Sequence, residues 1–196
     1  MLFRSRGQGC FSEYAALRAD QVVPLPERLS WEQGAAIPLA YVTVYEMLFT
    51  YGKLKAGETL LVTGASSGVG VGCIQTGRAI GAKLIATSRS AAKLAKLKQA
   101  GLELGIESHD GKFADKVLEA TGGEGANLAI DLVGGGVFPE LVRSLANKGR
   151  LAIVGSLDGV KEGVLDLSSV HAKRLQIFGV SNARMSPARS EEHTSE

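Results

Sequence analysis

The chemistry suggested by this sequence begins at a glycine-rich turn between an apolar segment and a helical one. The turn reads Thr63-Gly64-Ala65-Ser66-Ser67-Gly68-Val69-Gly70, and the strand-like run 59–63 leads into it. Small residues at such a turn let backbone N–H groups approach a pyrophosphate at the positive end of the following helix. A tight strand–helix turn without a ligand is the alternative. We expect a dinucleotide to be bound by Ser66, Ser67, Gly68, Val69 and Gly70.

A second candidate site lies about twenty residues further on, where the next strand should end. An NAD-binding chain would have Asp or Glu there to hold the ribose hydroxyls. This chain has Ser88, Arg89 and Ser90, with Lys93 one helical turn further. A carboxylate would repel a 2′-phosphate, whereas a guanidinium, an ammonium and hydroxyl groups can bind it. These residues predict that the chain binds NADPH rather than NADH. The alternative is that Arg89 and Lys93 are solvated charges at the start of a helix and bind no ligand.

The segments around these residues alternate between apolar strands and amphipathic helices. This alternation predicts a parallel sheet with helices on both faces and right-handed crossovers, which is a doubly wound α/β (Rossmann) fold. The expected strands are 59–63, 83–87, 102–106, 126–132, 150–154 and 175–180. The expected helices are one that follows the turn to about residue 80, then 91–100, 113–120 and 138–146. Because ligands bind at the carboxyl ends of such strands, Val133, Gly134 and Gly155 should line the cleft.

The chain before residue 58 has a different pattern. Residues 12–18 alternate as a short strand does, and the prolines at 24 and 26 exclude a helix there. Ser30 and Gln33 fit a capping box, which predicts a helix that begins near Trp31. A second helical pattern follows Pro38 and continues to about Tyr51.

Composition restricts the class of protein and its partners. The chain has 196 residues, 45% of them hydrophobic and 21% charged, as in soluble globular domains. Its net charge of +2 comes from mixed signs, so we expect neither a nucleic-acid nor a membrane partner. Cys10 and Cys73 have no partner motif, which predicts two reduced cysteines in a cytoplasmic protein.

The glycine turn resembles the opening motif of short-chain dehydrogenases. Members of that family need a catalytic Tyr-x-x-x-Lys after the turn. Tyr51 and Lys55 have this spacing, but they precede the turn, as do Tyr14, Tyr41 and Tyr45. We therefore exclude this family.

The order of motifs resembles the medium-chain dehydrogenase/reductase superfamily over residues 8–185. The motifs that carry the resemblance are Gly9-Cys10-Phe11-Ser12-Glu13-Tyr14, Val23-Pro24-Leu25-Pro26, the run 35–45 and Leu54-Lys55-Ala56-Gly57-Glu58. The resemblance implies that residues 6–30 are the remnant of a GroES-like catalytic domain. It also implies that residues 31–188 form a Rossmann domain that binds NADPH.

Within this superfamily, zinc alcohol dehydrogenases hold a catalytic zinc with Cys, His and a second Cys. By the match to residues 40–45, the second Cys corresponds to Leu39, which cannot bind a metal. The chain therefore resembles the zinc-free quinone oxidoreductases. This resemblance implies a small electrophilic molecule as the partner, with hydride transfer from NADPH to a quinone or an α,β-unsaturated carbonyl compound. Two alternatives stay open: a cofactor-binding module without activity of its own, and a zinc-type alcohol dehydrogenase.

The resemblance also implies roles for single residues. Thr43 matches a helix position whose hydroxyl faces the nicotinamide, although a bond to its own backbone is the alternative. Tyr41 corresponds to a position that either faces the substrate or packs in the core. Phe178 and Val180 belong to a strand that flanks the nicotinamide and pairs with its copy. The full-length protein is therefore expected to be a homodimer.

The two ends of the chain resemble translated adapter DNA. Residues 1–5 and 189–194 can be encoded by complementary strands of one short sequence. We expect residues 1–5 and 189–196 to be non-native and residues 6–188 to be an internal gene fragment.

Overall fold

The computed structural model describes residues 2–3, 13–14, 19, 22–155, 159–160 and 162–181. The chain divides into two compact units, one of residues 1–45 with 181–196 and one of residues 46–180. The domains expected at 6–30 and 31–188, and the non-native ends, stay predictions. Most of the strand expected at residues 12–18 lies outside the described residues. Among the residues described, no helix combines the length and the apolar character needed to span a membrane.

The described residues of the first unit include a short sheet and an α-helix. Strand β1 (Leu2–Phe3) pairs antiparallel with β2 (Val22–Val23). Helix α1 (Trp31–Tyr45) begins at the expected capping box, where Ser30 N donates to Gln33 Oε1 at 2.9 Å and Gln33 N donates to Ser30 Oγ at 3.2 Å. The prediction of a separate helix after Pro38 was wrong, because α1 passes through that residue. A proline removes a single donor, and a helix of 15 residues keeps its other hydrogen bonds.

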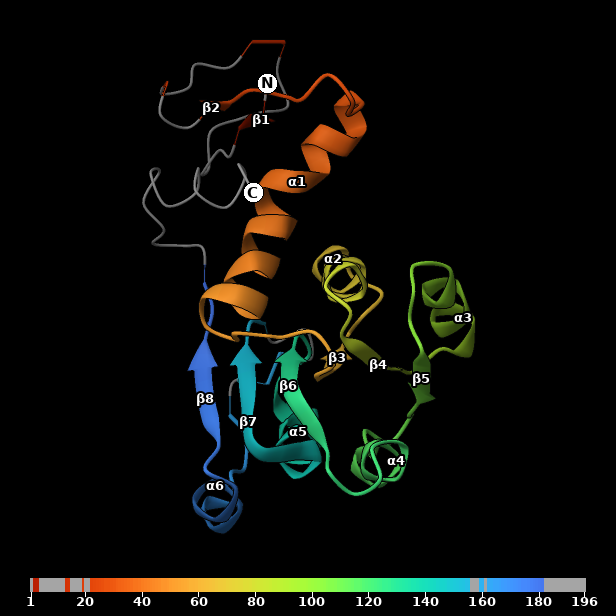
Figure 1. Cartoon of the computed structure of the whole chain (residues 1–196), viewed down its shortest axis with the longest axis vertical. Helices are drawn as coiled ribbons and strands as arrows, with labels where there is room; N and C mark the ends of the chain where they lie inside the picture. Colours follow the sequence, from red (N-terminus) through yellow and green to blue (C-terminus); the bar gives the residue numbers. More distant parts are fainter. Residues whose placement is uncertain are drawn as a thin grey trace. The chain divides into compact units, whose positions relative to one another are not determined.

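The second unit is built on a six-stranded parallel sheet (Figure 1). The strands are β3 (Thr59–Thr63), β4 (Lys83–Ser88), β5 (Leu104–Glu107), β6 (Ala126–Asp131), β7 (Leu145–Ile153) and β8 (Gln176–Gly179). Their order in the sheet is β5-β4-β3-β6-β7-β8, so the chain extends the sheet first on one side of β3 and then on the other. This order confirms the doubly wound α/β fold expected from the sequence.

Helices connect the strands of this unit. They are α2 (Gly68–Ala79), α3 (Ala91–Gln99), α4 (Ala114–Ala120), α5 (Phe138–Ser144) and α6 (Leu167–Lys173), with a π-helical segment η2 (Glu46–Thr50) and a 3₁₀ turn η3 (Gly135–Val137). The sequence did not predict α6. Its cap is Asp166, whose carboxylate accepts from Ser168 N at 3.0 Å.

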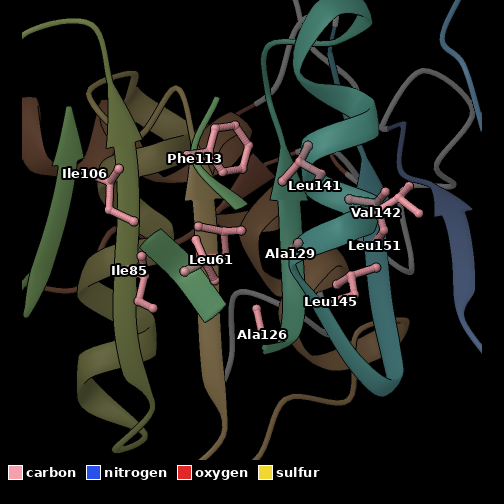
Figure 2. Close-up of a cluster of buried hydrophobic side chains, with 11 residues drawn as sticks. Leu61, Ile85, Ile106, Phe113, Ala126, Ala129, Leu141, Val142, Leu145 and Leu151 are labelled. Carbon is pink, nitrogen blue, oxygen red and sulfur yellow. The ribbon is translucent and has the colours of Figure 1, made fainter. Parts of the chain in front are cut away.

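Apolar side chains are buried on both faces of the sheet. On one face, Leu61 of β3 and Ile85 of β4 belong to a cluster with Phe113 and with Leu141 of α5 (Figure 2). On the other face, a Cβ at Gly77 of α2 would lie 2.7 Å from Leu84 Cδ2 and 3.0 Å from Leu60 Cδ2. Helix α2 therefore packs closely against these two leucines at Gly77. Burial on two faces explains why the strands are nearly continuous apolar runs.

Candidate functional site

The glycine turn lies at the carboxyl end of β3, where the strand order of the sheet reverses. Ser67 is the N-cap of α2, and its Oγ accepts from Gly70 N at 3.1 Å. Ser67 N donates to Gly64 O at 3.0 Å, which closes the turn. The hydroxyl of Ser67 therefore holds the turn in shape, in addition to the phosphate contact expected of it.

The turn has the space and the donors that a pyrophosphate needs. A Cβ at Gly70 would lie 2.6 Å from Ala65 Cα, so only glycine allows the helix to start this close to the turn. A Cβ at Gly68 would meet nothing within 4 Å, and Ser66 is exposed. Within the described part of the chain, the amides of Gly68 and Val69 have no acceptor. Donors at the positive end of a helix form an anion-binding site.

The turn is joined to β6 by a buried contact between Thr63 and Asp131. The Thr63 hydroxyl donates to Ile130 O at 3.2 Å or to Asp131 Oδ1 at 3.3 Å, and it accepts from Leu132 N at 3.2 Å. Asp131 Oδ1 also accepts from Val133 N at 3.0 Å and from Gly134 N at 2.8 Å. Asp131 thus shapes the loop after β6, and this use of Thr63 was not expected from the sequence.

The expected 2′-phosphate residues lie together at the end of β4 and the start of α3. Ser88 Oγ accepts from Ser90 N at 3.2 Å, and Ser90 caps α3 by accepting from Lys93 N at 3.4 Å. Arg89 and Lys93 are exposed, and among the described residues neither forms an ion pair. The two cations are therefore available to an anionic ligand.

A cavity of about 400 Å³ lies at the carboxyl ends of β6 and β7. It brings together Gly134 and Gly155, as expected, and adds Asp131, Phe138 and Glu162 to its lining. Val133 does not line it, although its amide binds Asp131. Gly134 has a φ of +88°, which disfavours any side chain at this position. No pattern in the sequence pointed to Phe138 or Glu162 as lining residues.

Phe178 and Val180 lie at the end of the edge strand β8. The Phe178 ring packs against Tyr51 with 5.9 Å between ring centroids, and Val180 N donates to Ile153 O at 2.9 Å. Val180 is buried. Neither residue lines the cavity beside β7, and their contacts with a nicotinamide stay predictions.

Tyr41 and Thr43 belong to the other unit, in α1. The Thr43 hydroxyl donates to Leu39 O at 2.7 Å, which is the backbone bond considered as the alternative. Tyr41 is half-buried. The catalytic roles of both residues stay predictions. In the described ranges, no three His, Cys, Asp or Glu side chains converge as a metal site would require.

One carboxylate near the expected phosphate site was missed. Glu107 is the register partner of Ser88 across β4 and β5. Its Oε1 accepts from Ala91 N, the first amide of α3, at 3.3 Å and lies 3.1 Å from His109 Nε2. The sequence could not reveal it, because the pairing depends on the register of two strands.

Taken along one edge of the sheet, these features fit a dinucleotide. The donors of the turn suit a pyrophosphate, the groups after β4 suit a phosphorylated ribose, and the cavity beside β6 and β7 suits the other end of the ligand. The fold and this edge define a domain of the Rossmann class.

Comparisons with known proteins agree with this class. A family model described as zinc-binding dehydrogenase matches residues 68–194. Human quinone oxidoreductase is 32% identical over 172 residues, which cover 88% of this chain and 51% of that protein. The nucleotide-binding subdomain of the enoylreductase domain of PpsC from Mycobacterium tuberculosis superposes with a TM-score of 0.72 at 31% identity, over 80% of this chain and 88% of that one. A mycobacterial protein in complex with NADPH gives a TM-score of 0.82 at 26% identity, over 90% of this chain and 55% of that one.

The chain therefore belongs to the zinc-binding dehydrogenase family and to the medium-chain dehydrogenase/reductase superfamily, as a fragment similar to quinone oxidoreductases. It spans about half the length of the human relative, which is 51% covered.

Proposed function

We propose that the full-length protein is an NADPH-dependent oxidoreductase that transfers a hydride to a quinone or an α,β-unsaturated carbonyl compound. The observation that carries this proposal is the turn after β3, whose amides at Gly68 and Val69 are open at the start of a 12-residue helix. The names of the relatives support the substrate class, because they include a quinone oxidoreductase and an enoylreductase domain.

The preference for NADPH rests on Ser88, Arg89, Ser90 and Lys93. The cations supply charge, and Arg89 can donate two parallel hydrogen bonds to a phosphate. A structural neighbour in complex with NADPH supports the same coenzyme.

A substitution tests this preference. Arg89→Gln should weaken NADPH binding about tenfold and leave NADH binding within about twofold, because only NADPH carries the 2′-phosphate. Isothermal titration with each coenzyme measures both constants. Lys98→Gln, an exposed charge at the far end of α3, is the matched control. An equal loss of affinity for NADPH and NADH in Arg89→Gln would contradict the proposed preference for NADPH.

The bound coenzyme would supply the hydride, and the protein would position it. The turn after β3 would hold the pyrophosphate, while Asp131 keeps the loop after β6 in the shape that presents Gly134 to the cavity. We assign no proton donor within this chain. Reduction of a quinone or an enone leaves an anion that water can protonate.

The zinc-type alcohol dehydrogenase is the second candidate, favoured by the name of the matching family model. It needs a ligand at the position of Leu39, whose side chain is apolar and 63% exposed. We propose a reaction without zinc. Elemental analysis of the full-length protein tests it, since stoichiometric zinc would contradict the proposal.

The third candidate is a module that binds coenzyme without turnover. Mixing the 196-residue chain with NADPH and a quinone separates binding from reaction. Binding with no quinone-dependent oxidation would favour the module for this chain. If neither NADPH nor NADH binds the folded chain, the oxidoreductase proposal fails.

We also propose that the full-length protein is a cytoplasmic homodimer. The supporting feature is β8, which ends the described sheet and leaves one side without a neighbouring strand. Such an edge pairs readily with a second chain. Light scattering of the full-length protein during size exclusion measures its mass, and a monomer at micromolar concentration would contradict the dimer.

A further inference from the structure

The end of β5 places a carboxylate beside the residues expected to hold the 2′-phosphate. Ser88 and Glu107 are partners in the parallel register of β4 and β5. Neighbouring strands are about 4.8 Å apart, and side chains of register partners point to the same face of the sheet. Glu107 therefore lies next to Ser88 on the face where α3 begins.

The contacts of Glu107 hold its charge at this place. Its Oε1 accepts from Ala91 N at 3.3 Å, directly after the cap residue Ser90. The same oxygen lies 3.1 Å from Nε2 of His109, whose side chain is 73% exposed. The Glu107 side chain is 44% exposed and remains open to a ligand. The carboxylate thus occupies the N-terminal amide of α3 that a phosphate could otherwise use.

We propose that Glu107 is a specificity-determining residue for the coenzyme, which opposes the 2′-phosphate of NADPH and accepts a hydrogen bond from the ribose 2′-hydroxyl of NADH. This inference rests on the proposed coenzyme-binding function. In an NAD-binding domain, a carboxylate at the end of the second strand binds the ribose hydroxyls. Here that strand ends at Ser88 and is followed by Arg89, and the adjacent strand supplies the carboxylate.

Opposing charges therefore meet at this subsite. Arg89 and Lys93 attract the 2′-phosphate, while Glu107 repels it and favours the unphosphorylated ribose. The protein should consequently bind both coenzymes, with a preference for NADPH smaller than the two cations alone would give. Charges a few ångströms apart at a half-exposed site change affinity on the order of tenfold.

Glu107→Gln tests the inference because glutamine can keep the bond to Ala91 N and loses only the charge. Glu103→Gln is the matched control, since Glu103 is exposed and lies before the opposite end of β5. The dissociation constants of NADPH and NADH are measured by isothermal titration with the 196-residue chain and each variant. We expect the preference for NADPH over NADH to rise about tenfold in Glu107→Gln and to stay within about twofold in the control.

An unchanged preference in Glu107→Gln, with both coenzymes still bound, would overturn the role of Glu107 and leave the proposed function in place. Failure of both coenzymes to bind the unaltered chain would instead overturn the proposed function, and this inference with it.

Two smaller ligands provide a second measurement that does not involve the nicotinamide end. Adenosine 2′,5′-bisphosphate and adenosine 5′-monophosphate differ only in the 2′-phosphate. Glu107→Gln should tighten binding of the bisphosphate about tenfold and should not tighten binding of the monophosphate. Equal effects on the two ligands would also overturn the inference.

Discussion

The two edges of the parallel sheet use their polar groups in different ways. At the carboxyl edge, the amides of Gly68 and Val69 and the cations Arg89 and Lys93 have no partner within the described part of the chain. At the amino edge, all three guanidinium nitrogens of Arg150 in β7 donate hydrogen bonds. Its guanidinium donates to Glu58 Oε2 at 2.7 Å, to Lys53 O at 3.0 Å and to Asn127 O at 3.1 Å.

Cavity size does not distinguish the edges. A cavity of about 460 Å³ lies at the amino edge, which is no smaller than the one of about 400 Å³ at the carboxyl edge. Two of the polar side chains that line it are paired within the protein: Asn127 Oδ1 accepts from Thr59 N at 2.8 Å, and Thr121 Oγ1 accepts from Gly125 N at 2.8 Å. Volume alone therefore does not single out the carboxyl edge, and the open amides of Gly68 and Val69 are the feature that favours it as the proposed coenzyme site.

The largest effect should come from glycine substitutions in the turn. Gly70→Ala would place its Cβ 2.6 Å from Ala65 Cα. It should lower the free energy of unfolding by about 3 kcal/mol and weaken NADPH binding at least ~100-fold. Thermal unfolding and titration measure the two effects.

Gly68→Ala is the matched variant because its Cβ meets nothing within 4 Å in the free protein. Its stability should be unchanged or slightly higher, while NADPH binding weakens about tenfold. If Gly68→Ala bound NADPH normally, the carboxyl edge would not be the phosphate site.

Arg150→Met, at the amino edge, should have effects opposite to those of Gly68→Ala: it should lower stability and leave NADPH binding unchanged. The Arg150 side chain is 12% exposed, and its loss leaves Glu58 partly buried with one partner fewer. We expect the free energy of unfolding to fall by about 3 kcal/mol, with NADPH affinity of the folded protein unchanged. Chemical denaturation measures stability. Lys148→Met removes the same charge from an exposed residue nearby and should cost far less. A selective loss of NADPH affinity in Arg150→Met would remove the contrast between the edges.

A smaller effect is expected at Asp166, whose oxygens are already used within its own helix. Hydrogen bonds from Ser169 and Ser168 lower the pKa of Asp166 from 3.8 to about 2. A pKa lowered by folding adds stability above the ordinary value, and this stability is lost as the pH falls through about 2. Carboxyl chemical shifts during an acid titration measure this pKa. Asp166→Asn keeps a cap, so it should remove the pH dependence of α6 and leave NADPH affinity unchanged.

Local patterns in the sequence predicted the centre of the fold well. Strand β3 has the predicted bounds, because a continuous apolar run ends at a glycine turn. The cap at Ser30 was also predicted, because Gln33 three residues later completes a capping box. Such features depend on contacts a few residues apart, which a sequence displays directly.

Features that depend on long-range contacts were not predictable. Thr63 and Asp131 are 68 residues apart, and Glu107 reaches Ser88 only through strand register.

Helix α6 was missed because serines at its start have low helix propensity, while the Asp166 cap stabilises it. The continuous helix through Pro38 was missed because one lost donor did not outweigh its remaining hydrogen bonds.

The contact between Thr63 and Asp131 has a consequence for synthesis on the ribosome. The 68 residues between them take about 3 to 14 seconds to translate at ordinary rates. During that time the apolar strand β3 has emerged with β4 and β5 but lacks β6 on its other side. A nascent chain stalled before residue 126 should therefore expose an aggregation-prone strand edge and be a substrate for chaperones.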